Sequence, residues 1–271
     1  MKYYSIRPPA RLRNYVRSFW VLEGNVSSAQ PYIHRTLASY CPELIFHYKG
    51  RFEELCAGGE QHVSFLTGLH AQTSQYRRFI IKENFGIFGV YLQPYAIPAL
   101  LGMPAHVVIN ELPDLHTLLG QEGRQLEEQV MLAATGQQRV QLVSAFLEKR
   151  IQSIRKPGIV EAIQTIYRLK GQVNCKQLAA EACLSQRQFE RNFKEMAGFN
   201  PKLFARIVRF NMLLCNPVKA PSLTQLAYEY GYYDQAHFIE DFKAFSGYSP
   251  RNFFSGNAPE TMYSGPQSMV D

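Results

Sequence analysis

A run of charged side chains between residues 187 and 194 is spaced to lie on one face of a helix. Arg187, Glu190, Arg191 and Lys194 recur at steps of three and four residues, the spacing that brings helical side chains together. An arginine can make a bidentate contact to guanine and a glutamate can accept from cytosine, so such a face can read base edges in the major groove. The alternative interpretation is a solvated helix face with an internal Glu190–Lys194 ion pair.

The segment that carries this face occurs twice, which favours the DNA interpretation. The offset between the copies is constant except for one residue added near Tyr233. The first copy reads Leu178-Ala-Ala-Glu-Ala-Cys-Leu-Ser185, then Phe189, Phe193, Lys194, Gly198 and Pro201; the second reads Leu226-Ala-Tyr-Glu-Tyr-Gly-Tyr232, then Asp234, Phe238, Phe242, Lys243, Gly247 and Pro250.

Each copy has the pattern of a helix-turn-helix unit. A short helix packs through its Leu-Ala pair, and the chain then turns at Cys183 or Gly231. Ser185 and Asp234 carry the side-chain oxygens expected of an N-cap, so a second helix should begin after each. The stripes expected to be buried in these second helices are Phe189, Phe193 and Met196 in one and Phe238, Phe242 and Phe245 in the other.

The second copy is less basic on its free face, which carries Gln235, Ala236, Ile239 and Glu240 with Lys243 at the edge. Between the copies, Pro201 to about Asn216 reads as one continuous helix. Such a strut can hold two recognition helices one turn of duplex, about 34 Å, apart. The cations that we expect at DNA phosphates, where contacts position without specifying sequence, are Lys194, Lys202, Arg206, Arg209, Lys243 and Arg251.

The net charge is concentrated in the same part of the chain. The whole sequence carries +7, and residues 155–254 hold 14 Lys and Arg against 8 Asp and Glu, whereas the rest holds 15 against 14. This placement indicates a polyanion-facing C-terminal third. The five cysteines are odd in number and form no CxxC pair, so we expect neither disulfides nor a metal site. No apolar run reaches the roughly 18 residues of a membrane span, so we expect a soluble cytoplasmic protein.

The N-terminal half is predicted to be rich in β-structure. Short β-branched and aromatic runs at 16–22, 43–48, 76–81 and 86–92 alternate with glycines, which is typical of an antiparallel barrel or sandwich with a concave mouth. Helices are expected at 122–133 and 137–152, and Lys156-Pro157-Gly158 then interrupts the pattern. The predicted fold class is therefore α+β with two domains, β-rich over 1–155 and all-α over 156–256, before a disordered tail at 257–271.

From Pro157 to Phe254 the sequence resembles the AraC/XylS family of transcription regulators, whose DNA-binding domain is a pair of helix-turn-helix units joined by a long helix. The resemblance implies base contacts by Arg187, Glu190 and Arg191 in the first unit and by Gln235, Ala236 and Glu240 in the second. The family often has arginine where Glu240 stands. This departure leaves direct readout by the second unit in doubt.

The N-terminal half resembles, less specifically, the sensor and dimerisation domains of the same family, many of which are cupin-like and hold a small effector. A pocket here would be walled by Trp20, Phe46, Phe65 and Tyr91, with Arg35 or Arg78 orienting an acidic group; the alternative is that these aromatic residues are simply core. His34, His47, His62 and His70 are too far apart in sequence to indicate a metal set. No cofactor is expected.

The sequence contains no phosphate loop, nucleophile elbow or HExxH motif, so we expect no enzymatic activity. The alternatives are a DNA-repair alkyl acceptor, which would need an activated cysteine, and a protein-interaction module tethered to DNA. The expected partners are double-stranded DNA, an unidentified small-molecule effector, RNA polymerase and a second copy of the chain, for which the helix at 137–152 offers an apolar stripe.

Overall fold

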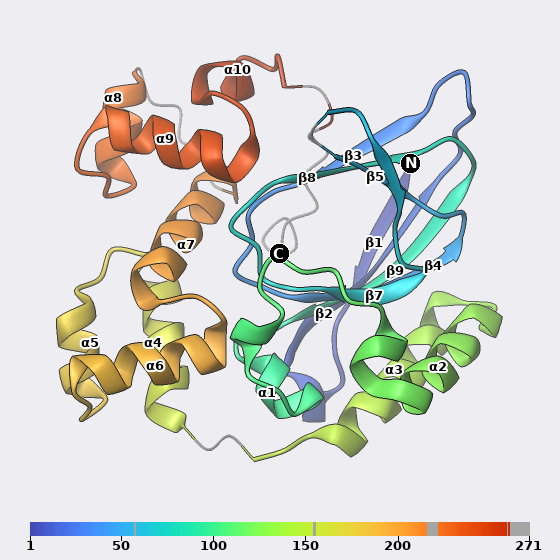
Figure 1. Cartoon of the computed structure of the whole chain (residues 1–271), viewed down its shortest axis with the longest axis horizontal. Helices are drawn as coiled ribbons and strands as arrows, with labels where there is room; N and C mark the ends of the chain where they lie inside the picture. Colours follow the sequence, from blue (N-terminus) through green and yellow to red (C-terminus); the bar gives the residue numbers. More distant parts are fainter. Residues whose placement is uncertain (57, 154–155, 216–221, 259, 261–271) are drawn as a thin grey trace.

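The computed structural model describes residues 1–56, 58–153, 156–215, 222–258 and 260. A β-rich N-terminal domain lies beside a helical C-terminal domain (Figure 1). The first helix of the C-terminal domain begins at Pro157. Proline is favoured at that position since its missing N–H would be unpaired in a first helical turn anyway.

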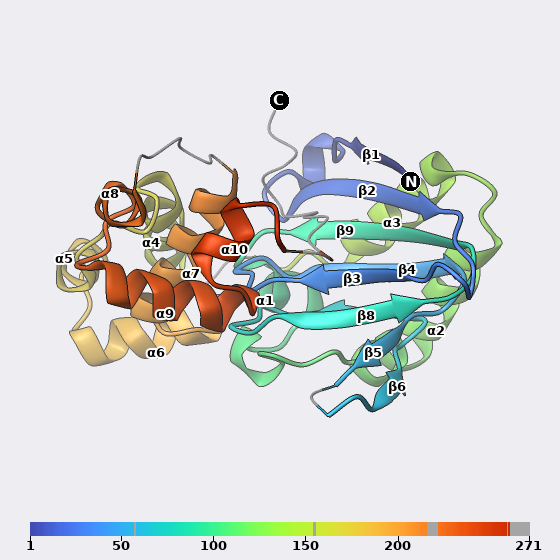
Figure 2. The ribbon, with the colours of Figure 1, turned by 90° about the horizontal axis from the view of Figure 1, so that it is seen from above.

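Two antiparallel sheets face each other in the N-terminal domain (Figure 2). One has the order β1-β2-β9-β4-β7 and the other β3-β8-β5-β6. The strands are β1 Lys2–Ile6, β2 Val16–Gly24, β3 Tyr32–Thr36, β4 Glu43–Lys49, β5 Glu53–Leu55, β6 Gln61–Val63, β7 Thr67–His70, β8 Arg77–Ile81 and β9 Phe85–Leu92. The four strands expected from the sequence are β2, β4, β8 and β9, so the sandwich prediction is confirmed.

Strand β9 is buried along its whole length because both of its faces are covered. Phe85, Ile87 and Tyr91 face a core between the two sheets, whereas Phe88 and Val90 face a core against helices. Gly89 has no side chain where the indole of Trp20 crosses the strand; a Cβ there would stand 2.0 Å from a ring carbon. The alternation of strand side chains thus builds two separate cores from one strand.

Helices cover the outer face of the five-stranded sheet, as Figures 1 and 2 show. They are α1 Ala96–Leu101, α2 Leu115–Leu132 and α3 Gly136–Arg150, with the short 3-10 turns η1 Ala10–Leu12 and η2 Ala105–Val107. Val140, Val143 and Leu147 of α3 are buried against the sheet. The two predicted helices correspond to α2 and α3, although α2 begins earlier than expected, where Asp114 caps it.

The described residues of the C-terminal domain form helices joined by turns and loops. Its helices are α4 Pro157–Arg168, α5 Cys175–Glu181, α6 Gln186–Ala197, α7 Pro201–Cys215, α8 Leu223–Glu229, α9 Gln235–Ser246 and α10 Pro250–Phe254. The long helix expected from Pro201 is α7, and its predicted end at Asn216 lies just outside the described residues. The tail prediction at 257–271 likewise falls mostly outside them.

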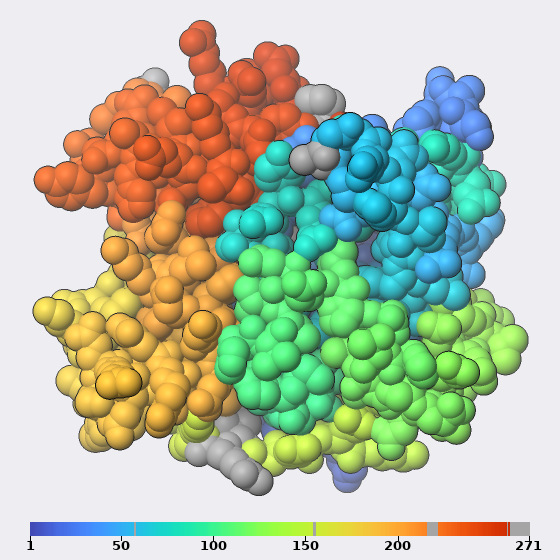
Figure 3. Space-filling view, viewed as in Figure 1, coloured from blue at the N-terminus to red at the C-terminus, as the bar shows by residue number. Residues whose placement is uncertain are grey.

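The two domains share one hydrophobic core and abut along a continuous seam (Figure 3). The β3–β4 loop, residues 37–42, reaches into the C-terminal domain with Leu37, Ala38 and Tyr40 buried. Ala38 N–H donates to the carbonyl of Phe245 over 2.9 Å, and the Asn211 amide nitrogen donates to the Ala38 carbonyl over 2.8 Å. One loop of the sensor-like domain therefore holds both α7 and α9.

Candidate nucleic-acid interface and a cavity between the sheets

The first helix-turn-helix unit consists of α5 and α6. The chain turns between them at Cys183, which adopts a left-handed backbone with φ of 54°. Ser185 then caps α6 in a reciprocal capping box with Gln188, which satisfies N–H groups at the helix start. Phe189, Phe193 and Met196 are buried, as predicted.

The second unit repeats this geometry with α8 and α9. Gly231 takes the left-handed position, with φ of 71°, where glycine is the favoured residue. The Asp234 carboxylate caps α9 by accepting from the N–H of His237 over 2.8 Å. Phe238, Phe242 and Phe245 are buried, so the predicted turns, caps and buried stripes of both units are confirmed.

The candidate base-contacting residues stand on the outward faces of α6 and α9. Arg187, Glu190 and Arg191 are exposed, and within the described chain neither arginine forms an ion pair. On α9, Ala236 and Glu240 are exposed, whereas Gln235 is half-buried and accepts from the Thr224 hydroxyl over 2.6 Å. The first unit thus presents free arginines and the second a smaller, less basic surface; base contact itself stays a prediction for all of them.

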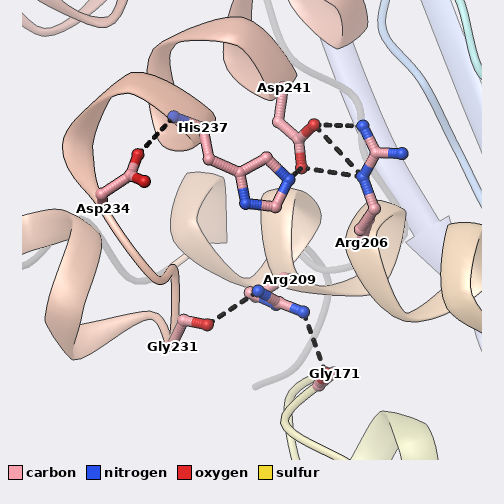
Figure 4. A network of polar contacts seen from close by, with 7 residues as sticks. All are labelled: Gly171, Arg206, Arg209, Gly231, Asp234, His237 and Asp241. Atoms are coloured by element: carbon pink, nitrogen blue, oxygen red, sulfur yellow. Dashed lines mark hydrogen bonds and ion pairs between the residues drawn. The ribbon is translucent and has the colours of Figure 1, made fainter. Parts of the chain in front are cut away.

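The candidate phosphate-contacting residues divide into two groups. Lys194, Lys202, Lys243 and Arg251 are exposed. Arg206 and Arg209 are instead engaged within the domain (Figure 4). Any phosphate contact by these two arginines would have to coexist with their bonds to Asp241 and Gly231.

The Arg206 guanidinium on α7 holds the buried carboxylate of Asp241 on α9. Arg206 Nε lies 3.2 Å and 3.1 Å from the two Asp241 oxygens, and Nη2 adds a further bond. These bonds raise the pKa of Arg206 above its ordinary value. His237 approaches the same carboxylate at 3.8 Å. The Asp241 carboxylate thus fixes α9 to the connecting helix α7 (Figure 4).

Arg209, one turn further along α7, joins the two units. Its Nη1 donates to the carbonyl of Gly231 over 2.7 Å, and its Nη2 lies 3.5 Å from the carbonyl of Gly171 (Figure 4). Gly231 is the turn of the second unit, and Gly171 lies between α4 and α5. Helix α7 therefore sets the relative orientation of the two units through its polar side chains as well as its apolar ones.

A cavity lies between the two sheets. The wall combines apolar and aromatic side chains with polar ones, and the β3–β4 loop closes one end. The lining residues used below are Trp20, His34, Thr36, Glu43, His47, Phe52, Phe65, His70 and Phe79. We call this space the sheet cavity.

The structure brings only part of the predicted pocket to the sheet cavity. Trp20 and Phe65 line it, and Arg35 contributes to its wall. Tyr91 belongs to the core between the sheets, and Phe46 faces the core against the helices. The reason is strand alternation: neighbouring residues of β4 point to opposite faces.

The two arginines expected to orient an acidic ligand are occupied by a carboxylate of the chain itself. Arg35 Nη2 lies 3.0 Å from Glu260, while Arg78 Nε and Nη2 lie 2.9 Å and 2.6 Å from it. The two arginines are cross-strand neighbours on β3 and β8. Their guanidinium groups bind Glu260 of the C-terminal domain, and Arg35 is in addition part of the cavity wall.

Three histidines that are distant in sequence meet at the sheet cavity: His34, His47 and His70. Burial lowers the pKa of His34 and of His47 to about 4 and that of His70 to about 3. All three are therefore neutral at pH 7. The described residues contain no group of three or more His, Cys, Asp or Glu arranged to hold a metal ion. Sequence spacing could not have found this cluster, because it depends on which strands pair.

Cys41, at the end of the β3–β4 loop, is not an activated thiol. Burial raises its pKa to about 11, and Arg17 Nη1, 3.4 Å from its sulfur, offsets only part of that effect. An alkyl-accepting cysteine would need the opposite shift. None of the helices in the described ranges has the length and apolarity needed to cross a membrane.

Comparison with known families matches both parts of the chain. Residues 178–256 match the helix-turn-helix domain family, and residues 4–113 match a domain family of unknown function (DUF6597). No curated protein matches the chain.

Solved structures resemble it at low identity. ToxT from Vibrio cholerae O395 is 14% identical, with 88% of this chain and 97% of that one covered and a TM-score of 0.44. The DNA-binding domain of AdpA in complex with a target DNA is 22% identical, covering 36% of this chain and 91% of that one, with a TM-score of 0.34. The C-terminal domain of AraT from Geobacillus stearothermophilus is 20% identical over 41% of this chain and 94% of that one, with a TM-score of 0.35.

Proposed function

We propose that the chain, whose residues 178–256 match the helix-turn-helix domain family, is an AraC-type DNA-binding transcription regulator that reads its operator by placing α6 and α9 in successive major grooves. In this proposal Arg187, Glu190 and Arg191 read one block of bases. Gln235, Ala236 and Glu240 contact a second block about one turn, 34 Å, away.

One observation carries the proposal: two units of the same geometry are fixed to one helix. Arg206 fastens α9 to α7, and Arg209 fastens the second turn to the α4–α5 connection. A rigid pair of this kind can bind a site only if its two blocks have the matching spacing. Lys194, Lys202, Lys243 and Arg251 would add phosphate contacts around the two helices.

We further propose that a small effector in the sheet cavity regulates this binding. The β3–β4 loop supports the idea because it lines the cavity with residues 37–39 and 41 and contacts α7 and α9 through Ala38. A ligand that moves this loop would therefore change the position of the second unit. The change in DNA-binding free energy would be limited to the difference between the ligand's binding free energies for the two positions of the second unit.

A homodimer and contact with RNA polymerase complete the proposed role in the cytoplasm. The groove between α2 and α3 supports a dimer contact: Leu132 is 87% exposed at its rim, and Leu142 and Phe146 are half-buried along it. An apolar stripe on a helix pair is a common dimer surface.

The experiment selects bound sequences from a random duplex pool with the full-length protein. The affinity for the most enriched sequence is then measured at several salt concentrations. We expect an enriched site with two blocks one turn apart and a steep decrease of affinity with salt. A single block would contradict paired readout. Absence of enrichment both with and without a metabolite extract would contradict sequence-specific binding.

A further inference from the structure

Glu43 places an acidic group inside the N-terminal domain. It stands at the start of β4, opposite His70 on β7 and Tyr91 on β9, and it lines the sheet cavity. Its side chain is surrounded by protein, but the residue keeps accessible surface because it faces the cavity. It is therefore available to a molecule in the cavity.

No cation within the described residues pairs with this carboxyl. Glu43 takes part in none of the ion pairs of the described chain, and its neighbours Trp20 and Tyr91 are uncharged. Arg35 and Arg78, on β3 and β8, hold Glu260 instead. Burial without a counterion raises the pKa of Glu43 well above its ordinary value, as expected when a charged form loses its hydration.

The rest of the wall suits a cation with an apolar body. Trp20, Phe52, Phe65 and Phe79 supply aromatic surface, and aromatic faces attract cations, most strongly once water is excluded. The three histidines are neutral there and add no repulsion. Two polar atoms of the wall, Thr36 Oγ1 and His47 Nδ1, are buried without a hydrogen-bond partner, so a ligand with a further polar group would find partners as well.

We propose that the sheet cavity binds a small organic cation, a protonated amine on an apolar or aromatic body, with the Glu43 carboxylate as its counterion. This inference deepens the proposed effector function and rests on it for its regulatory meaning. A carboxylate ligand would meet Glu43 as a like charge and would find the arginines already bound to Glu260. A neutral ligand would give the Glu43 carboxyl no counterion.

The test uses matched probes on the full-length protein. Arylalkylamines with spacers of different lengths, phenethylamine among them, are compared by calorimetry and thermal unfolding with 2-phenylethanol and 3-phenylpropionate, which keep the ring and change the charge. Each titration is repeated with Glu43→Gln and, as a matched control, with Glu60→Gln, whose carboxylate is 79% exposed on the same domain. Without ligand, Glu43→Gln should melt no lower than the wild type, which shows that it folds.

We expect at least one amine to bind and raise the melting temperature, the alcohol to bind at least tenfold more weakly and the acid weakest. Glu43→Gln should weaken amine binding at least tenfold, and Glu60→Gln should leave it unchanged. Preference for the acid or the alcohol, equal amine binding by Glu43→Gln, or binding of no amine in the series would overturn the proposal.

Operator binding, measured in parallel, separates this inference from the function. Amine binding that leaves operator affinity unchanged would support the ligand class and refute the effector role. If the protein binds its operator but no amine, the proposed ligand class is refuted and the proposed DNA-binding function stands.

Discussion

Arg35 and Ser246 connect the sheet that lines the cavity to the end of the second recognition helix. The Arg35 Nη1 donates to the Ser246 carbonyl over 3.2 Å, at the C-terminal end of α9. The guanidinium also lies 4.2 Å from the ring centre of Tyr248 and 4.7 Å from that of Tyr76. Its neighbours on β3, His34 and Thr36, line the sheet cavity. Strand β3 thus contacts the cavity with one face and the DNA-binding domain with the other.

Replacing Arg35 by alanine should loosen this connection. The Arg35→Ala variant loses a charge-assisted bond and two ring contacts and leaves Glu260 with Arg78 alone, which should cost about 1–3 kcal/mol of unfolding free energy. Amide exchange at the end of α9 should accelerate. The measurements are urea unfolding and hydrogen exchange by mass spectrometry, with Arg11→Ala, whose side chain is 84% exposed, as the control. Unchanged exchange at residues 245–248 would show that Arg35 does not hold α9.

The ion pair between Arg206 and Asp241 should contribute strongly to the stability of the second helix-turn-helix unit. The Asp241 side chain is only 1% exposed, whereas that of Arg206 is 33% exposed. Asp241→Ala should therefore destabilise the chain by about 2–3 kcal/mol, less than a fully buried pair would cost because water reaches the arginine. Denaturant unfolding measures this, and the exposed neighbour substitution Glu240→Ala should change stability by less than about 0.5 kcal/mol. Equal effects of the two substitutions would contradict the assigned role of Asp241.

Acidification should destabilise the N-terminal domain through its cavity histidines. Their folded pKa values, about 4 for His34 and His47 and about 3 for His70, lie below the unfolded value of 6.5. Stability is therefore unaffected by these histidines above pH 6.5 and decreases as the pH falls from 6.5 toward the folded values, because only the unfolded state takes up the protons in that range. Between pH 7 and 5 each should cost about 1–2 kcal/mol, against which the raised pKa of Glu43 acts in the opposite direction.

Urea unfolding of wild type and His70→Gln at pH 7 and pH 5 measures this loss. The variant should lose less stability than the wild type over that interval, because it has one histidine fewer to protonate on unfolding. Identical pH dependence of the two proteins would show that His70 is not held neutral.

The helix-turn-helix units could be predicted from sequence because their signals are local. Ser185 and Asp234 cap helices within three residues of themselves, and Cys183 and Gly231 turn the chain between adjacent helices. The repeat reinforced each signal. Even so, local spacing could not show that Arg206 pairs with Asp241, since these residues lie 35 positions apart on two different helices.

The sheet cavity could not be predicted in the same way. Short strands such as β3 and β7 carry weak signals, and whether a residue faces the cavity depends on register. A shift of one residue would exchange His34 for Arg35. Arg35 and Arg78, which were expected to orient an acidic ligand, hold the carboxylate of Glu260 of the chain itself.

Lys202 offers a test of phosphate contact at the start of α7. It is exposed, and Lys202→Ala should weaken binding by a similar factor on operator and random duplex and reduce the salt slope by about one. Fluorescence anisotropy at several salt concentrations measures both quantities. Lys49→Ala, exposed on the other domain, should change neither. A loss confined to the operator would instead assign Lys202 to base readout.

Paired readout by α6 and α9 is tested most directly by mapping which bases each helix contacts. Methylation interference on the selected operator is compared for wild type, Arg191→Ala and Gln235→Ala. Arg191→Ala should erase interference in one block at a cost of about 1–3 kcal/mol on the operator alone. Gln235→Ala should affect only a second block, one turn away. Loss of the same block in both variants, or equal losses on operator and random duplex, would contradict the account.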